Sequence, residues 1–181
     1  MTVRPIRYLG DPVLRRPAKK VRRIDDSIRR LILDMTDSMI EAQGVGIAAP
    51  QIGVSLRIVV IGMPDEEPYA LINPVVVRRS GERRLDEGCL SVPGYRGNLT
   101  RSLRVTVKAL NPLGREVRVK AEDDLLAQAL EHETDHVNGI VYVDRLDSTD
   151  DLVKLEAPFV RARPGESGER ALAGRPSEDD A

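Results

Sequence analysis

The segment LEHETDHVNG, residues 130–139, contains both histidines of the 181-residue chain, four positions apart. Residues at this spacing share one face of a helix, so His132 and His136 can bind one metal ion through their ring nitrogens. Glu133 lies about 100° further round such a helix, beside the metal, where its carboxylate can accept a proton from water. The pattern indicates a metal-dependent hydrolase, although both histidines also continue an apolar stripe and fit a plain helix core.

A metal site of this kind needs a third protein ligand. A metzincin peptidase would place a histidine ten residues after His132, but that position is Tyr142, which excludes this class. A thermolysin-like peptidase would use a downstream glutamate, for which Glu156 is the candidate. The alternative is Cys89, whose thiolate is a strong ligand for zinc or ferrous iron, although a lone cysteine is often a small buried residue. The residue types alone leave both third ligands open.

The composition is that of an ordinary soluble globular protein, with 41% hydrophobic and 31% charged residues and a formal net charge of −1. This balance gives no electrostatic reason to expect nucleic acid or a membrane surface as a partner. One cysteine cannot form an internal disulfide, so a reducing cytoplasm is the expected compartment. No apolar run reaches the roughly 18 residues of a membrane span, and the N-terminal residues lack the apolar core of a signal peptide.

The elements that must position these residues indicate a single α+β domain over residues 1–160, followed by a disordered tail over 161–181. Helical periodicity covers two segments, and the second contains the histidines and opens at Glu122 or Asp123. Alternating residues on either side of NPLG predict a hairpin, because this tetrapeptide is rich in turn formers. The predicted helices are 24–43 and 122–138, and the predicted strands are 56–63, 69–77, 103–110 and 115–121.

Three motifs in order, GVGIAAPQ at 44–51, EGCLSVP at 87–93 and HETDH at 132–136, resemble those of the peptide deformylase family. The resemblance extends over roughly residues 1–147. It implies an α+β fold in which antiparallel sheets wrap around a central C-terminal helix carrying the histidine motif. It also implies a hydrolase that removes the formyl group from the N-terminal formylmethionine of new polypeptides, giving formate and a free amino terminus.

The same resemblance implies a role for each motif residue. The metal would be Fe²⁺, replaceable by Zn²⁺ or Ni²⁺, with Glu133 as general base and acid. Gln51 and the backbone N–H of Leu90 would stabilise the charge that develops on the formyl oxygen. A formyl-Met peptide would be the partner, with the ribosome a weaker expectation and no direct contact with nucleic acid or membrane. The expected metal ligands are Cys89, His132 and His136, and the expected substrate-binding residues are Val45, Gly46, Gly88 and Arg96.

Some expectations concern the surroundings of the site. Leu85, Leu125 and Ala129 are candidates for the methionine pocket, although each also fits a plain core position. Family members usually have glutamine before the first histidine. Here Glu131 adds a negative charge close to the metal site, with either an effect on metal affinity or on the pKa of bound water, or a side chain directed at solvent. The C-terminal part lacks the long basic helix of many bacterial members, which weakens the expectation of ribosome docking by that element. Glu131 and the unusual tail suggest a third hypothesis, an inactive member kept as a metal-dependent binding module. A buried pair of Arg101 and Asp135 is expected to fix the motif helix.

Overall fold

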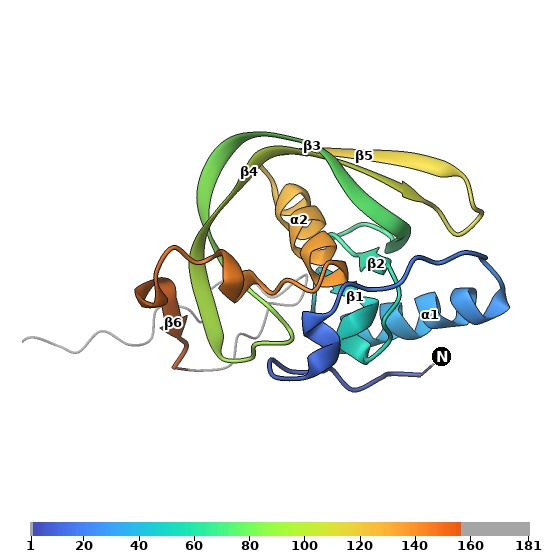
Figure 1. The fold of residues 1–181 in the computed structure, drawn as a ribbon, viewed down its shortest axis with the longest axis horizontal. Helices are drawn as coiled ribbons and strands as arrows, with labels where there is room; N and C mark the ends of the chain where they lie inside the picture. Colours follow the sequence, from blue (N-terminus) through green and yellow to red (C-terminus); the bar gives the residue numbers. More distant parts are fainter. Residues whose placement is uncertain (1, 157–181) are drawn as a thin grey trace, which may run out of the picture.

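One sheet dominates the computed structural model, which describes residues 2–156 (Figure 1). Its strands follow the order β1-β2-β3-β4-β5, every neighbouring pair is antiparallel, and β6 pairs with β4. The predicted tail at 161–181 and the predicted boundary at residue 160 lie outside the described residues. The strands are β1 Gly46–Ala48, β2 Ile58–Ile61, β3 Tyr69–Gly88, β4 Tyr95–Leu110, β5 Glu116–Glu122 and β6 Leu152–Lys154.

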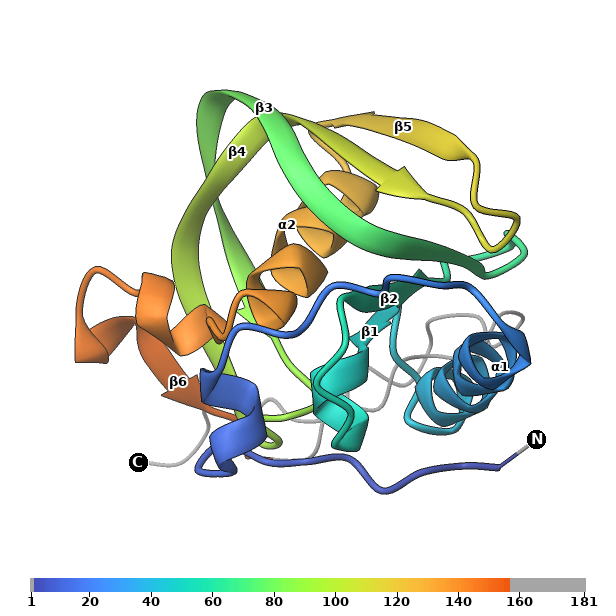
Figure 2. The same ribbon diagram turned by 45° about the vertical axis from the view of Figure 1, so that its right-hand side comes forward.

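The long pair β3–β4 gives the sheet its shape. Its register shifts between Ile72 and Val75 and again between Val76 and Arg78, and such bulges bend a strand and increase its twist. The pair therefore curls into an arch over the second helix (Figure 2). Strand β3 is much longer than the predicted strand at 69–77. The predicted hairpin is confirmed, since β4 pairs with β5 from Arg104 opposite Glu122 to Leu110 opposite Glu116.

Helix α1, Asp26–Glu41, begins where the sequence places its capping acids. The side chain of Asp25 accepts hydrogen bonds from the backbone N–H groups of Ser27 and Ile28, which satisfies two donors that the first turn leaves unpaired. Its apolar stripe packs on β1 and β2, where Met35 and Met39 contact Ile47 and Ile58 within one buried cluster. The predicted amphipathic helix is thus confirmed, with its end at Glu41 rather than near Gly44.

Helix α2, Leu125–Val137, carries the histidine motif through the middle of the fold. Its N-cap is Asp124, whose side chain accepts from the N–H of Ala127. The predicted cap at Glu122 or Asp123 is wrong, because Glu122 is the last residue of β5 and Asp123 has a φ of +50°. Every residue from Ala129 to Val137 is buried, so the helix is enclosed on all sides over its second half.

Short 3₁₀ turns connect these elements and close the fold around α2: η1 Pro12–Arg15, η2 Ala49–Ile52, η3 Tyr142–Arg145 and η4 Thr149–Asp151. Gly139 ends α2 with a φ of +79°, and the N–H of Ile140 bonds back to the carbonyl of Asp135. In residues 2–156, neither helix has the length and apolar character that crossing a bilayer requires.

Candidate metal centre

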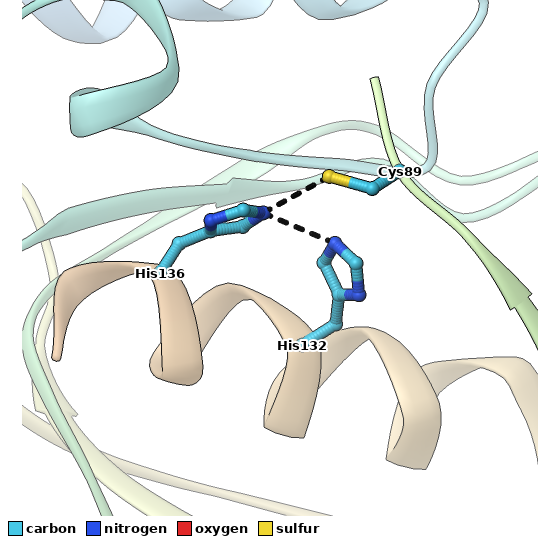
Figure 3. A group of neighbouring side chains, drawn as sticks. All are labelled: Cys89, His132 and His136. Atoms are coloured by element: carbon cyan, nitrogen blue, oxygen red, sulfur yellow. Dashed lines mark hydrogen bonds between the residues drawn. The ribbon is translucent and has the colours of Figure 1, made fainter. Parts of the chain in front are cut away.

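Cys89 and both histidines meet at one point beneath the arch (Figure 3). Cys89 follows the last residue of β3, whereas His132 and His136 lie one turn apart on α2. The Nε2 atom of His136 is 3.2 Å from the Sγ atom of Cys89 and 3.2 Å from Nε2 of His132. Two donor atoms on a tetrahedral metal lie roughly 3.4 Å apart, given metal–nitrogen distances of about 2.0–2.1 Å. The three donors therefore fit a single metal ion of the zinc or ferrous iron type.

The orientation of His132 supports this fit. Its Nδ1 atom lies 2.5 Å from Oε1 of Glu87, a buried carboxylate at the end of β3. A metal-binding histidine commonly donates its second ring N–H to a carboxylate, which fixes the tautomer and aims the other nitrogen at the metal. The contact with Glu87 therefore leaves Nε2 of His132 as the atom that faces Cys89 and His136.

Arg101 on β4 links Glu87 to the far side of α2. Its guanidinium donates two hydrogen bonds to Glu87, at 3.0 and 2.6 Å, and one to Asp135 at 2.6 Å. Burial tends to raise the pKa of Glu87, but His132 and Arg101 outweigh burial and hold that pKa at about 2. Asp135 also accepts two hydrogen bonds from Arg145. The expected contact of Arg101 with Asp135 is present, and it belongs to a larger network that holds the histidine helix against the strand leading to Cys89.

Glu133 occupies the position that a proton carrier would need. Its side chain is buried, and its Oε2 atom has no hydrogen-bond partner within residues 2–156. Burial, helped by the negative charge of Glu87 and opposed by His132, raises the pKa of Glu133 to about 7. A carboxyl group with a pKa in this range can both accept and release a proton near neutral pH.

Gly46 on β1 makes room for this carboxylate. A Cβ atom at Gly46 would lie 2.6 Å from Oε1 of Glu133 and less than 3 Å from its Cγ and Cδ atoms. The missing side chain at residue 46 therefore leaves the space that the side chain of Glu133 needs.

Gln51 lies on η2 with its amide directed towards the cysteine. Its Oε1 atom accepts from the N–H of Ala48 at 2.8 Å, which leaves the amide nitrogen to face Cys89 Sγ at 3.6 Å and Ser91 Oγ at 3.3 Å. Both contacts of the amide nitrogen are long for hydrogen bonds, so this nitrogen could donate instead to a nearby anionic oxygen. Leu90 follows Cys89 directly and lines the cavity next to the three potential metal ligands.

The metal-binding group opens into a cavity of about 480 Å³. Of the expected pocket residues, Leu125 and Ala129 line this cavity, whereas Leu85 does not. Gln128 lines the cavity as well. Its position one helical turn before His132 could have identified it from the sequence, because the two residues share a face of the helix. Leu155 also lines the cavity. It lies far from the motifs in the sequence, and no sequence feature identified it as a cavity residue. The expected substrate-binding residues Val45, Gly46, Gly88 and Arg96 all lie in the lining.

Glu131 faces neither the metal nor solvent. It is 5% exposed and points away from the donors towards β3 and β4. Its carboxylate accepts hydrogen bonds from the backbone N–H and hydroxyl of Ser102, at 2.8 and 3.1 Å, and from Nε of Arg79 at 2.8 Å. The expected orientation towards solvent is therefore wrong, because β4 passes close to this side of the helix and supplies donors. An effect of the Glu131 charge on the metal stays an expectation.

Glu156 does not take part in the cluster. Among the described residues, the group of potential metal ligands found around these histidines contains Cys89 and lacks any glutamate. The arrangement thus favours the cysteine as third ligand and removes the main support for a thermolysin-like site.

Comparison with known proteins agrees with this geometry. The family model described as polypeptide deformylase matches residues 3–151. A peptide deformylase of Dehalococcoides mccartyi is 52% identical over 156 residues, which cover 86% of this chain and 93% of the relative. A relative of the same name from Natranaerobius thermophilus is 52% identical over 146 residues, covering 80% and 93%.

Solved structures match the fold as well. A crystal structure of a peptide deformylase from Legionella pneumophila has a TM-score of 0.78 at 47% identity and covers 81% of this chain and 87% of its own. A peptide deformylase from Synechococcus elongatus, in complex with actinonin, has a TM-score of 0.78 at 41% identity and covers 81% and 82%. Because its sequence, its fold and the family model all match over most of the chain, this chain is a member of the peptide deformylase family.

Proposed function

We propose that this chain removes the formyl group from the N-terminal formylmethionine of newly made polypeptides, in the cytoplasm, and releases formate and a free amino terminus. The observation that carries the proposal is the meeting of Cys89, His132 and His136 with the buried, unpartnered oxygen of Glu133 in one cavity. Membership of the peptide deformylase family supports the choice of substrate.

The metal would be held by the thiolate of Cys89 and the Nε2 atoms of both histidines. Once bound, it would supply a water molecule of lowered pKa and polarise the formyl carbonyl. Fe²⁺ is the proposed ion, because it accepts a fifth ligand readily, while zinc with nitrogen and sulfur ligands is commonly four-coordinate. Zn²⁺ or Ni²⁺ would substitute. Fe²⁺-loaded protein prepared without oxygen should deformylate faster than the zinc form and lose that advantage in air.

The protein groups then divide the reaction between them. Glu133 accepts a proton from water as the water oxygen bonds to the formyl carbon. Negative charge develops on the formyl oxygen, and the amide of Gln51 and the N–H of Leu90 stabilise it. Glu133 returns the proton to the amine nitrogen while the carbon–nitrogen bond breaks, so that formate and the free amine leave.

Substrate would enter along the cavity beside Val45, Gly46, Gly88 and Arg96. The methionine side chain would lie against Leu125 and Ala129, which line the wall contributed by α2. The ribosome, as the source of nascent chains, is a partner that this activity implies but that no contact in the described residues specifies.

Formate release from formyl-Met-Ala, measured together with bound metal on the same sample, tests the proposal. Glu133→Ala should keep close to one metal ion per chain and lose most of kcat, because the residue carries protons and does not bind the ion. No formate from metal-loaded wild-type protein would contradict the proposed function and favour a binding module. Metal loss in Glu133→Ala equal to that in His132→Ala would contradict the role of Glu133.

A further inference from the structure

Leu155, the residue that follows the last described strand, forms part of the wall of the reactive cavity. Strand β6 pairs with the start of β4, with Tyr95 opposite Lys154 and Gly97 opposite Leu152. One residue further on, the N–H of Leu155 donates a 2.8 Å hydrogen bond to the carbonyl of Gly94. These bonds fix Leu155 to the segment that connects Cys89 to β4.

Leu155 thereby lines the cavity that contains Cys89, Gln51 and Glu133. In both views β6 lies to one side of α2, near the start of β4 (Figures 1 and 2). Two parts of this lining face the space beyond the potential metal ligands. One part belongs to α2 and contains Leu125, Gln128 and Ala129, whereas the other contains Pro93, Gly94, Tyr95 and Leu155.

The cavity is larger than one side chain requires. Its volume of about 480 Å³ is within the range of roughly 300–1,000 Å³ that holds a drug-sized ligand. With the formyl group at the metal ligands and the methionine against α2, the rest of a peptide needs further wall to lie on. Leu155 and Tyr95 offer apolar surface there, and Tyr95 is 37% exposed.

We propose that Leu155, held in place by β6, contacts the side chain of the second or third residue of the formylated peptide and favours an apolar residue at that position. This inference rests on the proposed function and extends it from the formylmethionine to the residues that follow. It makes the residue that follows β6 a specificity determinant, although no catalytic motif lies in this part of the chain.

The test compares three substrates: formyl-Met-Ala-Ala-Ala, formyl-Met-Leu-Ala-Ala and formyl-Met-Ala-Leu-Ala. Wild-type protein should prefer leucine at one of the two positions, by about tenfold in kcat/KM, the ratio typical of a few methylene groups in an apolar pocket. In Leu155→Ala the ratio of kcat/KM values between the leucine peptide and the all-alanine peptide should fall to about one.

Val153→Ala is the matched control, because Val153 lies on β6 two residues before Leu155, is 56% exposed and does not line the cavity. It should keep the wild-type preference. Leu155→Lys gives a second measurement, in which a new preference is gained rather than lost. It should shift the preference from leucine to glutamate at the same peptide position.

Two results would overturn the inference while leaving the deformylase activity intact. One is a wild-type enzyme that hydrolyses all three peptides at the same rate, and the other is a Leu155→Ala variant with an unchanged preference for leucine. Failure of the wild-type protein to release formate from any of the three peptides would instead count against the proposed function.

Discussion

Glu133 and Gly46 depend on each other although they are far apart in the chain. A Cβ atom on residue 46 would come within 2.6 Å of the Glu133 carboxylate. Because Glu133 is buried, its side chain has little room to move aside. Displacement of a catalytic group by about 1 Å can cost about a hundredfold in rate. Gly46→Ala should therefore lower kcat by about this factor while the protein still binds its metal.

A double-mutant cycle checks that the effect acts through Glu133. In a Glu133→Ala background the carboxylate is gone, so adding Gly46→Ala should change kcat little. Equal losses from Gly46→Ala in both backgrounds would show that the glycine acts through something else, such as the β1–β2 pairing.

Glu131 illustrates how a residue next to a ligand can have a purely structural role. Its carboxylate bonds to Ser102 and Arg79, on the side of α2 that faces β3 and β4. Glu131→Gln should leave bound metal and kcat within about twofold of wild type and lower the free energy of unfolding by about 1 kcal/mol, as expected for a hydrogen bond with a charged partner that is half exposed. Urea unfolding together with a formate assay would measure both, and a large change in metal affinity would contradict this role.

The candidate histidine ligands could be predicted from the residues alone, because histidines four apart on a helix share a face whatever surrounds them. The roles proposed for Cys89, Gln51 and Gly46 came instead from the resemblance of their motifs to a known family. The partners of Glu131 could not be predicted, since they depend on which residue of β4 passes that turn of the helix. Leu85 was misplaced for the same reason: its direction follows from the register of β3 and β4, where it pairs with Leu99.

At the level of elements, α1 and the β4–β5 hairpin were predicted from periodicity and turn residues. The second half of β3 was not, because its segment RRSGERRLDEG is rich in charged residues and has no apolar alternation. It is a strand because β4 pairs with it along its length and the arch leaves much of one face in solvent. Long-range pairing thus overrides local preference here.

The cap of α2 gives a prediction for an element. Asp124 accepts from the N–H of Ala127 at 2.6 Å and so stabilises the first turn of the helix that carries both histidines. Asp124→Ala should lower the free energy of unfolding by about 1 kcal/mol, and Asp124→Asn should restore most of that loss because its side chain can also cap. Thermal unfolding of the three proteins measures this, and equal stability of the alanine and asparagine variants would contradict the capping role.

For the whole molecule, the two sides of the metal centre belong to different parts of the fold. Cys89 follows the last residue of β3, one of the two strands of the arch, and the histidines lie on the helix beneath the arch. Glu87, Arg101 and Asp135 form the network that joins these two parts. The sequence predicted the fold class, the candidate ligands and, through the family resemblance, the pair of Arg101 and Asp135. The contacts of Glu87 with Arg101 and His132 became visible only in three dimensions.

A metal bound across these two parts should stabilise the whole fold, because the folded state holds the three donors together and the unfolded chain does not. At a metal concentration of about a hundred times its Kd, binding to one site adds about 2.7 kcal/mol, which for a chain of this size raises Tm by about 5 to 10 °C. Removal of the metal by a chelator should lower Tm by that amount in wild-type protein and in Glu156→Gln. In Cys89→Ala the chelator should have little effect, because that variant has lost a ligand. Thermal unfolding with and without chelator, alongside metal analysis, measures the difference; a chelator effect that survives in Cys89→Ala and disappears in Glu156→Gln would move the third ligand to the glutamate and restore the thermolysin-like reading.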